Sequence, residues 1–145
     1  MLGDNNRLVI HKNARFYGPC KIKLHGNATI EIGENAGIRG VEFLAKDANI
    51  YVGELCMFSY GIIIRTHDSH RIFDLETGAE TNKPKDVRLG KHVWIAQNAT
   101  ILKGVSIGDN SVIGFGAIVT KSCESNSVMT GIPAKVVKTG IYWDY

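Results

Sequence analysis

The sequence is poor in the features that mark several protein classes. Its three cysteines, Cys20, Cys56 and Cys123, are far apart and form no Cys-x-x-Cys pair, which argues against a disulfide framework or a thiolate zinc site. The hydrophobic composition indicates no membrane span. The polar stretch Met1–Arg7 lacks the basic and then apolar segments of a secretory signal. We therefore expect reduced thiols, no metal, no membrane span and a cytoplasmic location.

A strong excess of one charge is also missing. Seventeen basic residues face 14 acidic ones, and the formal charge of +3 is too small for a nucleic-acid footprint. It is compatible with binding a phosphorylated cofactor. A chain of 145 residues, 44% of them hydrophobic, is long enough to bury one core but short for two. We expect a single domain over residues 1–145.

What the sequence does contain is an internal repeat of six residues. Large aliphatic residues recur at this spacing, and a small or moderate residue follows each of them four positions later. The two sets are Leu89, Ile95, Ile101, Ile107, Ile113 and Val119, and Val93, Ala99, Val105, Ser111, Ala117 and Cys123. Six consecutive matches rarely arise by chance, and they indicate a repeat architecture.

The N-terminal half carries the same period with slips of two residues. Its runs are Ile10, Phe16, Ile22; Leu24, Ile30; Ile32, Ile38, Leu44, Ile50; and Val52, Phe58, Ile64. We interpret each slip as a small bulge at a corner of one coil. A period of six fits neither a helix nor a long half-buried strand. It fits a parallel β-coil whose turns stack about 4.8 Å apart and are stabilised by their neighbours.

Two stretches leave the repeat. Residues 65–88 are rich in charged and turn-forming residues and too long for a corner, so they should form an excursion loop, where function tends to concentrate. The tail after Val128 has too little periodicity for an assignment. We expect it to pack along the coil and cap it.

Several blocks resemble the bacterial hexapeptide-repeat acyltransferases. These are LGKHVWIA from Leu89, ATILKGV from Ala99, IGFGAIVTK from Ile113 and GIPAKVVK from Gly131. The loop block THDSHRIFD from Thr66 resembles the histidine-bearing loop of sugar and polysaccharide O-acetyltransferases, including galactoside and sialic acid acetyltransferases. The resemblance covers essentially the whole chain and is specific from about residue 64 to residue 138.

The resemblance implies an all-β fold, a left-handed parallel β-helix with three flat faces. This handedness opposes the usual crossover preference and does not follow from the period. It also implies a homotrimer with active sites between subunits. The expected reaction transfers an acetyl group from acetyl-CoA to a sugar hydroxyl in the synthesis or modification of a surface polysaccharide.

Such a transfer needs a base for the hydroxyl proton, and histidine suits this role because its unperturbed pKa lies near working pH. Two loop histidines compete, His67 and His70, and their spacing does not choose between them. The family pattern Ser-Asp-x-His selects His70 as the base and leaves His67 as a substrate-binding candidate. Asp68 could orient the imidazole of His70 by accepting its second N–H, or it could simply be a turn-forming residue.

The resemblance also assigns residues to the cofactor and the acceptor. Trp94 has the position of a tryptophan that lines the substrate tunnel and could hold the pantetheine arm or the sugar; core packing or a trimer contact is the alternative. Phe115, Ala117 and Thr120 match a stretch that contacts coenzyme A. Lys135 and Lys138 match positions near its phosphates.

The chain departs from the family pattern at two positions, and it carries a basic edge outside that pattern. Ala96 replaces the glycine of a Trp-Ile-Gly pattern, and Phe115 stands where the family usually has alanine. The bulk of Phe115 is expected to shift the cofactor contact there. Lys83, Lys85, Arg88 and Lys91 form a basic edge where the loop returns. This edge could guide an anionic acceptor or could simply be a solvated surface.

Three alternatives stay open. The same base and groove would serve N-acetylation of an amino sugar. Carbonic anhydrases built on this coil bind zinc through three histidines across subunits, and His67, His70 and His92 would be the candidates here, although their spacing is poor. A trimeric scaffold without catalysis is the third, because a fold does not fix a function.

Overall fold

The computed structural model describes residues 5–145, so residues 1–4 of the polar N-terminal segment lie outside the described residues. The described residues form β-strands, turns and loops. They include no helix long and apolar enough to cross a membrane.

The strands form three sheets, parallel except for β17, that are the three faces of one coil. Face 1 contains β1 (Arg7–Ile10), β4 (Thr29–Ile32), β7 (Ile50–Val52), β10 (Val87–Leu89) and β13 (Ser106–Ile107). Face 2 contains β2 (Arg15–Phe16), β5 (Gly37–Ile38), β8 (Met57–Phe58), β11 (Trp94–Ile95), β14 (Val112–Ile113), β16 (Ser127–Gly131) and β17 (Ala134–Thr139). Face 3 contains β3 (Cys20–His25), β6 (Val41–Lys46), β9 (Ile62–Arg65), β12 (Thr100–Ile101) and β15 (Ile118–Val119).

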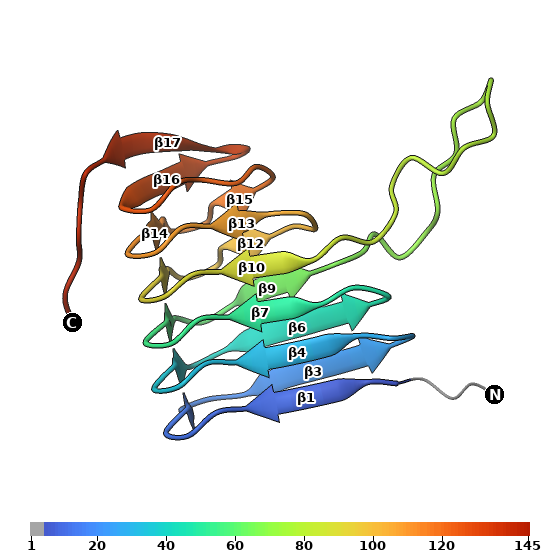
Figure 1. The fold of residues 1–145 in the computed structure, drawn as a ribbon. Coiled ribbons are helices and arrows are strands. Elements are labelled where there is room, and N and C mark those ends of the chain that lie inside the picture. The colour runs from blue at the N-terminus through green and yellow to red at the C-terminus, as the bar shows by residue number, and fades with distance from the viewer. Residues whose placement is uncertain (1–4) are drawn as a thin grey trace.

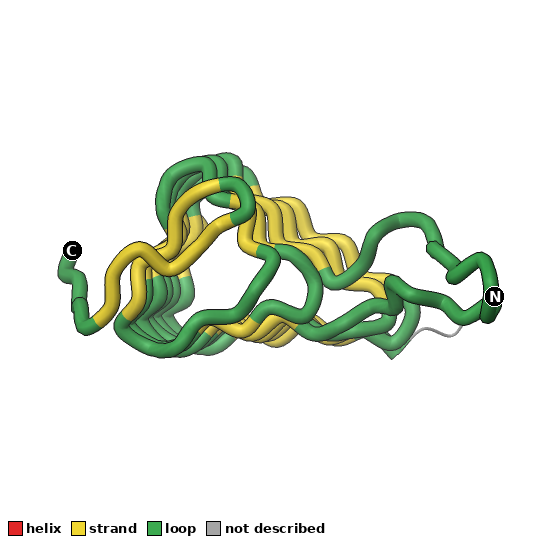
Figure 2. Tube along the Cα trace, turned by 90° about the horizontal axis from the view of Figure 1, so that it is seen from above, coloured by secondary structure: helices red, strands yellow, loops and turns green. Residues whose placement is uncertain are grey.

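The chain passes through faces 1, 2 and 3 in that order, and each circuit of three faces adds one layer to the coil. In Figure 1 the strands of face 1 cross the front of the coil from right to left as the chain climbs, and those of face 3 return behind them. That sense of rotation makes the coil left-handed. Viewed from above, the successive turns superpose as one stack (Figure 2). The prediction of an all-β, left-handed parallel β-helix is therefore confirmed.

The six-residue repeat corresponds to three ladders of inward side chains. On face 2 the ladder is Phe16, Ile38, Phe58, Ile95, Ile113 and Met129. On face 1 it is Ile10, Ile32, Val52, Leu89 and Ile107. Ile95, Ile101 and Ile113 are fully buried, as are Val93, Ala99, Val105, Ser111 and Ala117 between them. Each inward residue therefore packs on the residue in the turn below.

The face 3 ladder corrects one sequence prediction. It runs Ile22, Phe43, Ile64, Ile101 and Val119, so Phe43 and not Leu44 is the inward residue of β6. Both residues are apolar, and the period alone favoured the wrong one. Phe43 is fully buried and meets Phe58 edge to face, with ring centroids 6.2 Å apart. Leu44 points outward and is only half-buried.

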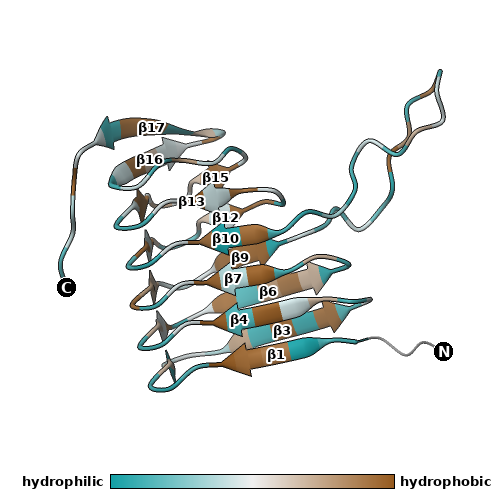
Figure 3. Ribbon diagram, viewed as in Figure 1, coloured by the Kyte–Doolittle hydropathy of each residue, from teal (hydrophilic) through white to brown (hydrophobic). Residues whose placement is uncertain are grey.

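The two-residue slips do not form corner bulges, which is a second correction. They lengthen the strands of the lower turns, because β3 and β6 have six residues each whereas β12 and β15 have two. Two added residues preserve the alternation of side chains between faces, so each extra pair adds one more inward residue. Leu24 and Ala45 form one such additional rung. Figure 3 shows the resulting alternation of hydrophobic and hydrophilic residues along these strands.

The two irregular stretches lie where the sequence placed them. The excursion loop leaves after β9, returns at β10 and projects away from the coil (Figure 1). The tail forms β16, which pairs with β14, and β17, which folds back antiparallel on β16 over the last turn. Residues 140–145 then descend beside the coil (Figure 1). The tail both caps the coil and packs along it, as expected.

The ladders predict where the fold is most sensitive to truncation. Ile101→Ala should lower the free energy of unfolding by about 2–5 kcal/mol, because it leaves a cavity between two fully packed turns. The matched change Ile72→Ala, at a residue that is 56% exposed in the excursion loop, should change it by less than about 0.5 kcal/mol. Urea denaturation of both variants measures the difference. Equal effects would contradict the ladder description of the core.

Candidate functional site

The excursion loop is fastened to the coil at its neck. The buried hydroxyl of Thr66 accepts a hydrogen bond from the Lys46 N–H at 2.9 Å and donates one to the Lys46 carbonyl at 3.2 Å. The Lys85 N–H donates to the Thr66 carbonyl at 3.0 Å and closes the neck. Asp86 then accepts the Asn49 N–H at 2.8 Å. The loop therefore begins and ends at fixed points on the corner between faces 3 and 1.

Both candidate histidines lie just beyond this neck. His67, Asp68 and His70 line one hollow of about 220 Å³ together with Lys46 and Asn82. Arg65, at the end of β9, donates through Nε to the His67 carbonyl at 2.6 Å and through its terminal nitrogen to Ser69 Oγ at 3.1 Å. The coil thus fixes the backbone that carries the histidines. The structure brings together the three loop residues that the sequence singled out.

The two histidines differ in their surroundings. His67 is half-buried, and its Nδ1 is enclosed without a hydrogen-bond partner among the described residues. Burial, followed by the nearby charges of Arg65 and Lys46, lowers the pKa of the His67 imidazole below its ordinary value. His70 is exposed at the mouth of the hollow. Of the two, His70 is the more accessible to a substrate from solvent.

Asp68 does not make the contact that the sequence suggested. Its Oδ2 accepts hydrogen bonds from Lys103 Nζ and from Asn82 Nδ2, the latter at 3.0 Å, and no bond joins it to the imidazole of His70. The Lys103 hydrogen bond is the main reason why the pKa of Asp68 lies below its ordinary value. The lysine cation thus holds the carboxylate against the turn after β12. Asp68 is linked to His70 only indirectly, because Asn82 also donates to the His70 carbonyl at 2.9 Å.

Asn82 and Lys103 are therefore the two site residues that sequence reasoning missed. Asn82 follows His70 by twelve residues and ties both sides of the loop together. Lys103 lies in the turn after β12, at a variable position of the repeat. Neither position carries a signal in a single sequence, because only the stacking of turns brings Lys103 beneath the loop.

Trp94 lies at another part of the coil. It is 42% exposed on β11 of face 2, directly after the corner between faces 1 and 2. The tail docks at that corner. Trp143 stacks on His92 with ring centroids 3.9 Å apart, donates from Nε1 to the His92 carbonyl at 2.8 Å, and lies 5.9 Å from Trp94 between centroids. Figure 2 shows the tail and the excursion loop at opposite ends of the cross-section. One chain therefore does not bring Trp94 and His70 together.

The predicted cofactor residues lie in the uppermost turns. Phe115 is 69% exposed at the corner between β14 and β15, and Thr120 is exposed just after β15. Lys135 and Lys138 are exposed on β17. Ala117 differs from them because it is fully buried. Its N–H donates to the Gly114 carbonyl and its own carbonyl accepts from the Thr100 N–H, so both backbone groups of Ala117 are already hydrogen-bonded within the coil.

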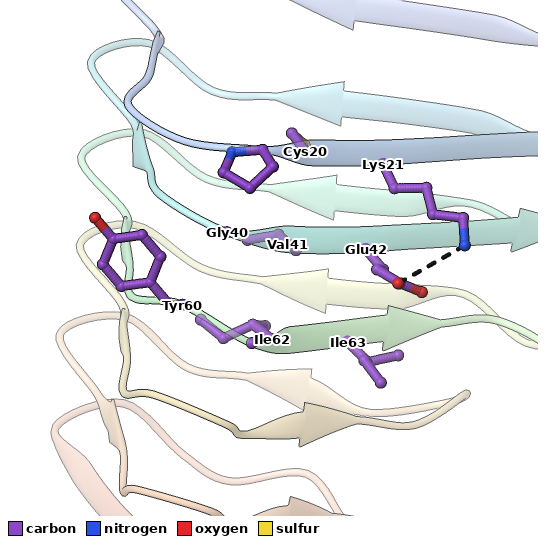
Figure 4. A pocket seen from close by; sticks show the side chains of 10 residues that line it. Cys20, Lys21, Gly40, Val41, Glu42, Tyr60, Ile62 and Ile63 are labelled. Carbon is purple, nitrogen blue, oxygen red and sulfur yellow. Dashed lines mark ion pairs between the residues drawn. The ribbon is translucent and has the colours of Figure 1, made fainter.

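A mainly apolar hollow and the third histidine considered for zinc, His92, both lie away from the histidine loop. Figure 4 shows a mainly apolar hollow on face 3 and the adjacent corner, with Tyr60 and Ile63 on its lining and the Lys21–Glu42 ion pair, 3.7 Å, across it. Among residues 5–145, no group of three or more metal-ligating side chains is clustered. His92 lies under Trp143, across the coil from His67 and His70.

Comparison with known proteins identifies relatives of this architecture. The family model of the bacterial transferase hexapeptide (six repeats) matches residues 86–121. The polysialic acid O-acetyltransferase of Escherichia coli O1:K1 / APEC is 39% identical over 135 residues, which are 92% of this chain and 43% of the relative. The chain thus spans less than half of that protein.

Solved structures give the same result. The polySia-specific acetyltransferase NeuO superposes with a TM-score of 0.92 at 37% identity, over 98% of this chain and 65% of NeuO. A galactoside acetyltransferase in complex with coenzyme A superposes with a TM-score of 0.65 at 28% identity, over 90% of this chain and 64% of that one. The repeat, the left-handed coil and these similarities together show that the chain belongs to the bacterial hexapeptide-repeat acyltransferase family.

Proposed function

We propose that the protein transfers an acetyl group from acetyl-CoA to a hydroxyl of a sugar in a surface polysaccharide. The observation that carries this proposal is the fixed histidine loop on a coil similar to polysialic acid O-acetyltransferases. The coenzyme A in the similar galactoside acetyltransferase supports the donor. The three free thiols of the described chain agree with a cytoplasmic location, which we also propose. N-acetylation of an amino sugar is the alternative to be tested beside it.

In this reaction His70 accepts the proton of the acceptor hydroxyl as the oxygen attacks the thioester carbonyl. The C–O bond forms and the C–S bond breaks, and His70 then returns the proton to the departing thiolate. Lys103 and Asn82 hold Asp68, and Asn82 holds the His70 carbonyl. These contacts fix the loop, so that the base is positioned before the substrates arrive. His67 lines the same hollow as a substrate contact.

The proposal includes a homotrimer in which neighbouring copies complete each site. It is supported by the positions of Trp94 and the histidine loop, which lie at opposite edges of one chain. It is further supported by outward, half-buried aliphatic side chains on face 3, where Ile63 and Ile118 flank Thr100 in one row and Leu102 lies just after β12. A second copy would cover this row and would bring its own Trp94 toward the loop. Phe115, Thr120, Lys135 and Lys138 are proposed to contact coenzyme A.

His70→Ala tests the reaction directly. We expect thiol release from acetyl-CoA in the presence of sugar acceptors to fall by about 10²–10⁴-fold, because the base is lost. Binding of coenzyme A should be unchanged, since His70 makes no proposed contact with it. His11→Ala, at an exposed histidine of the lowest turn, is the matched control and should remain active. Full activity in His70→Ala, together with loss in His67→Ala, would move the base to His67.

Lys103→Met tests the support beneath the loop. Removing the cation leaves Asp68 with Asn82 alone, and the loop backbone should lose its fixed position. We expect kcat to fall by about 10–100-fold while the KM for acetyl-CoA stays the same. Lys103→Arg should restore part of the rate, because it keeps the charge. Lys12→Met, at an exposed lysine paired with Glu34, is the control. A change in the KM of Lys103→Met without a change in its kcat would argue against a positioning role for Lys103.

A further inference from the structure

Two hollows lie on face 2 between Trp94 and the lowest turn. They share Met57, and we treat them together as one groove, which we define by Arg15, Tyr17, Arg39, Met57, Trp94 and Tyr145. Neither hollow is lined by an aspartate or a glutamate. The lining is therefore basic and aromatic, and it lies next to the tryptophan that the proposed function uses.

The backbone register explains the shape of the groove. Arg15, Gly37, Met57 and Trp94 occupy successive outward positions on β2, β5, β8 and β11. Gly37 contributes no side chain to this row. A Cβ added there would lie 2.8 Å from Met57 Sδ, so a larger residue would displace the Met57 side chain. The missing side chain leaves the depression between Arg15 and Met57.

The tail forms one wall of the groove. The stacking of Trp143 on His92 holds the tail against the corner, and the Tyr145 hydroxyl donates to the Leu55 carbonyl at 3.4 Å. Tyr145 remains 72% exposed, and Tyr17 across the groove is 59% exposed. At the other edge the guanidinium of Arg39 lies 6.0 Å from the centroid of the Tyr60 ring. Exposed aromatic rings thus stand beside both arginines.

The two arginines have charges that the chain does not neutralise. Arg15 and Arg39 are exposed, and neither forms an ion pair or a side-chain hydrogen bond within residues 5–145. By contrast, Arg88 and Lys91 of the basic edge at the loop's return pair with Asp86 at 3.3 Å and with Glu54 at 2.6 Å. A free guanidinium presents a planar fork that matches a carboxylate. The groove is therefore suited to an anionic ligand with sugar-like faces.

We propose that Arg15 and Arg39 bind carboxylates of acidic sugar units while the acceptor chain lies along this groove with its reacting unit near Trp94. The inference rests on the proposed function and narrows its acceptor to an anionic glycan. Arg39 lies two turns below Trp94 and Arg15 lies three, or about 10 and 14 Å at the usual strand spacing. The arginines therefore contact units other than the one that is acetylated. Longer acidic oligomers should bind better than a single sugar.

The double variant Arg15→Gln/Arg39→Gln tests the groove. The acceptors are a sialic acid oligomer and the same oligomer with its carboxylates converted to uncharged methyl esters. We expect the KM for the charged oligomer to rise by about tenfold or more, with kcat and the KM for acetyl-CoA unchanged. The KM for the ester should hardly change. Arg15→Lys/Arg39→Lys, which keeps the charge but loses the fork, should give an intermediate KM.

Lys83→Gln/Lys85→Gln is the matched control, because it removes two charges from the rival basic edge. The inference would be overturned if the arginine variant still preferred the charged oligomer to the methyl ester while this control variant lost that preference. Equilibrium binding of the oligomer to each variant separates the two proposals. Transfer by the wild type to neutral sugars only would refute the groove and leave the proposed function. Arginine-dependent binding without transfer to any acceptor would refute the proposed function and leave the groove.

Discussion

Every other property of this protein depends on the packing of each inward side chain on the one in the turn below. Ile95 lies between Phe58 and Ile113, and Ile101 lies between Ile64 and Val119. If the strand pairing of one turn shifted by one residue, the inward side chains of that turn would face solvent, because side chains alternate between the inside and the outside. Extra residues can therefore enter in only two ways. They lengthen strands in pairs, as in β3 and β6, or they leave the coil at a corner, as in the excursion loop.

That constraint also determines where chemistry can be built. The coil interior is mainly apolar and closed to solvent, so functional groups must lie on outward rows or on segments that leave the stack. The histidine loop is fixed at the corner between faces 3 and 1 by Thr66, Lys85 and Asp86. Trp94 and the tail occupy the corner between faces 1 and 2 and its neighbouring face. A rigid coil cannot fold these two edges together, and this is the physical reason for proposing that neighbouring copies share each site.

The sequence predicted the ladders well because their information is local and repeated. The six-residue spacing identified Leu89 through Val119, the excursion and the cap. It failed at β6, where the period selects Leu44 but the adjacent apolar residue Phe43 is the one that points inward. It also failed for Asp68, whose partners Lys103 and Asn82 are 35 and 14 residues away and meet it only through stacking and loop closure. Handedness came from family resemblance, because a period is the same in either sense of rotation.

The most direct test of the shared site is complementation between two inactive variants. His70→Ala and Trp94→Ala would be unfolded together, refolded as a mixture and assayed for acceptor-dependent thiol release. If one copy supplies the histidine and its neighbour the tryptophan, each mixed trimer contains one intact site, and random mixing should restore about a quarter of the wild-type activity. A mixture that remains as inactive as its components, although mass spectrometry shows mixed trimers, would contradict this account and would place both residues in the site of a single chain.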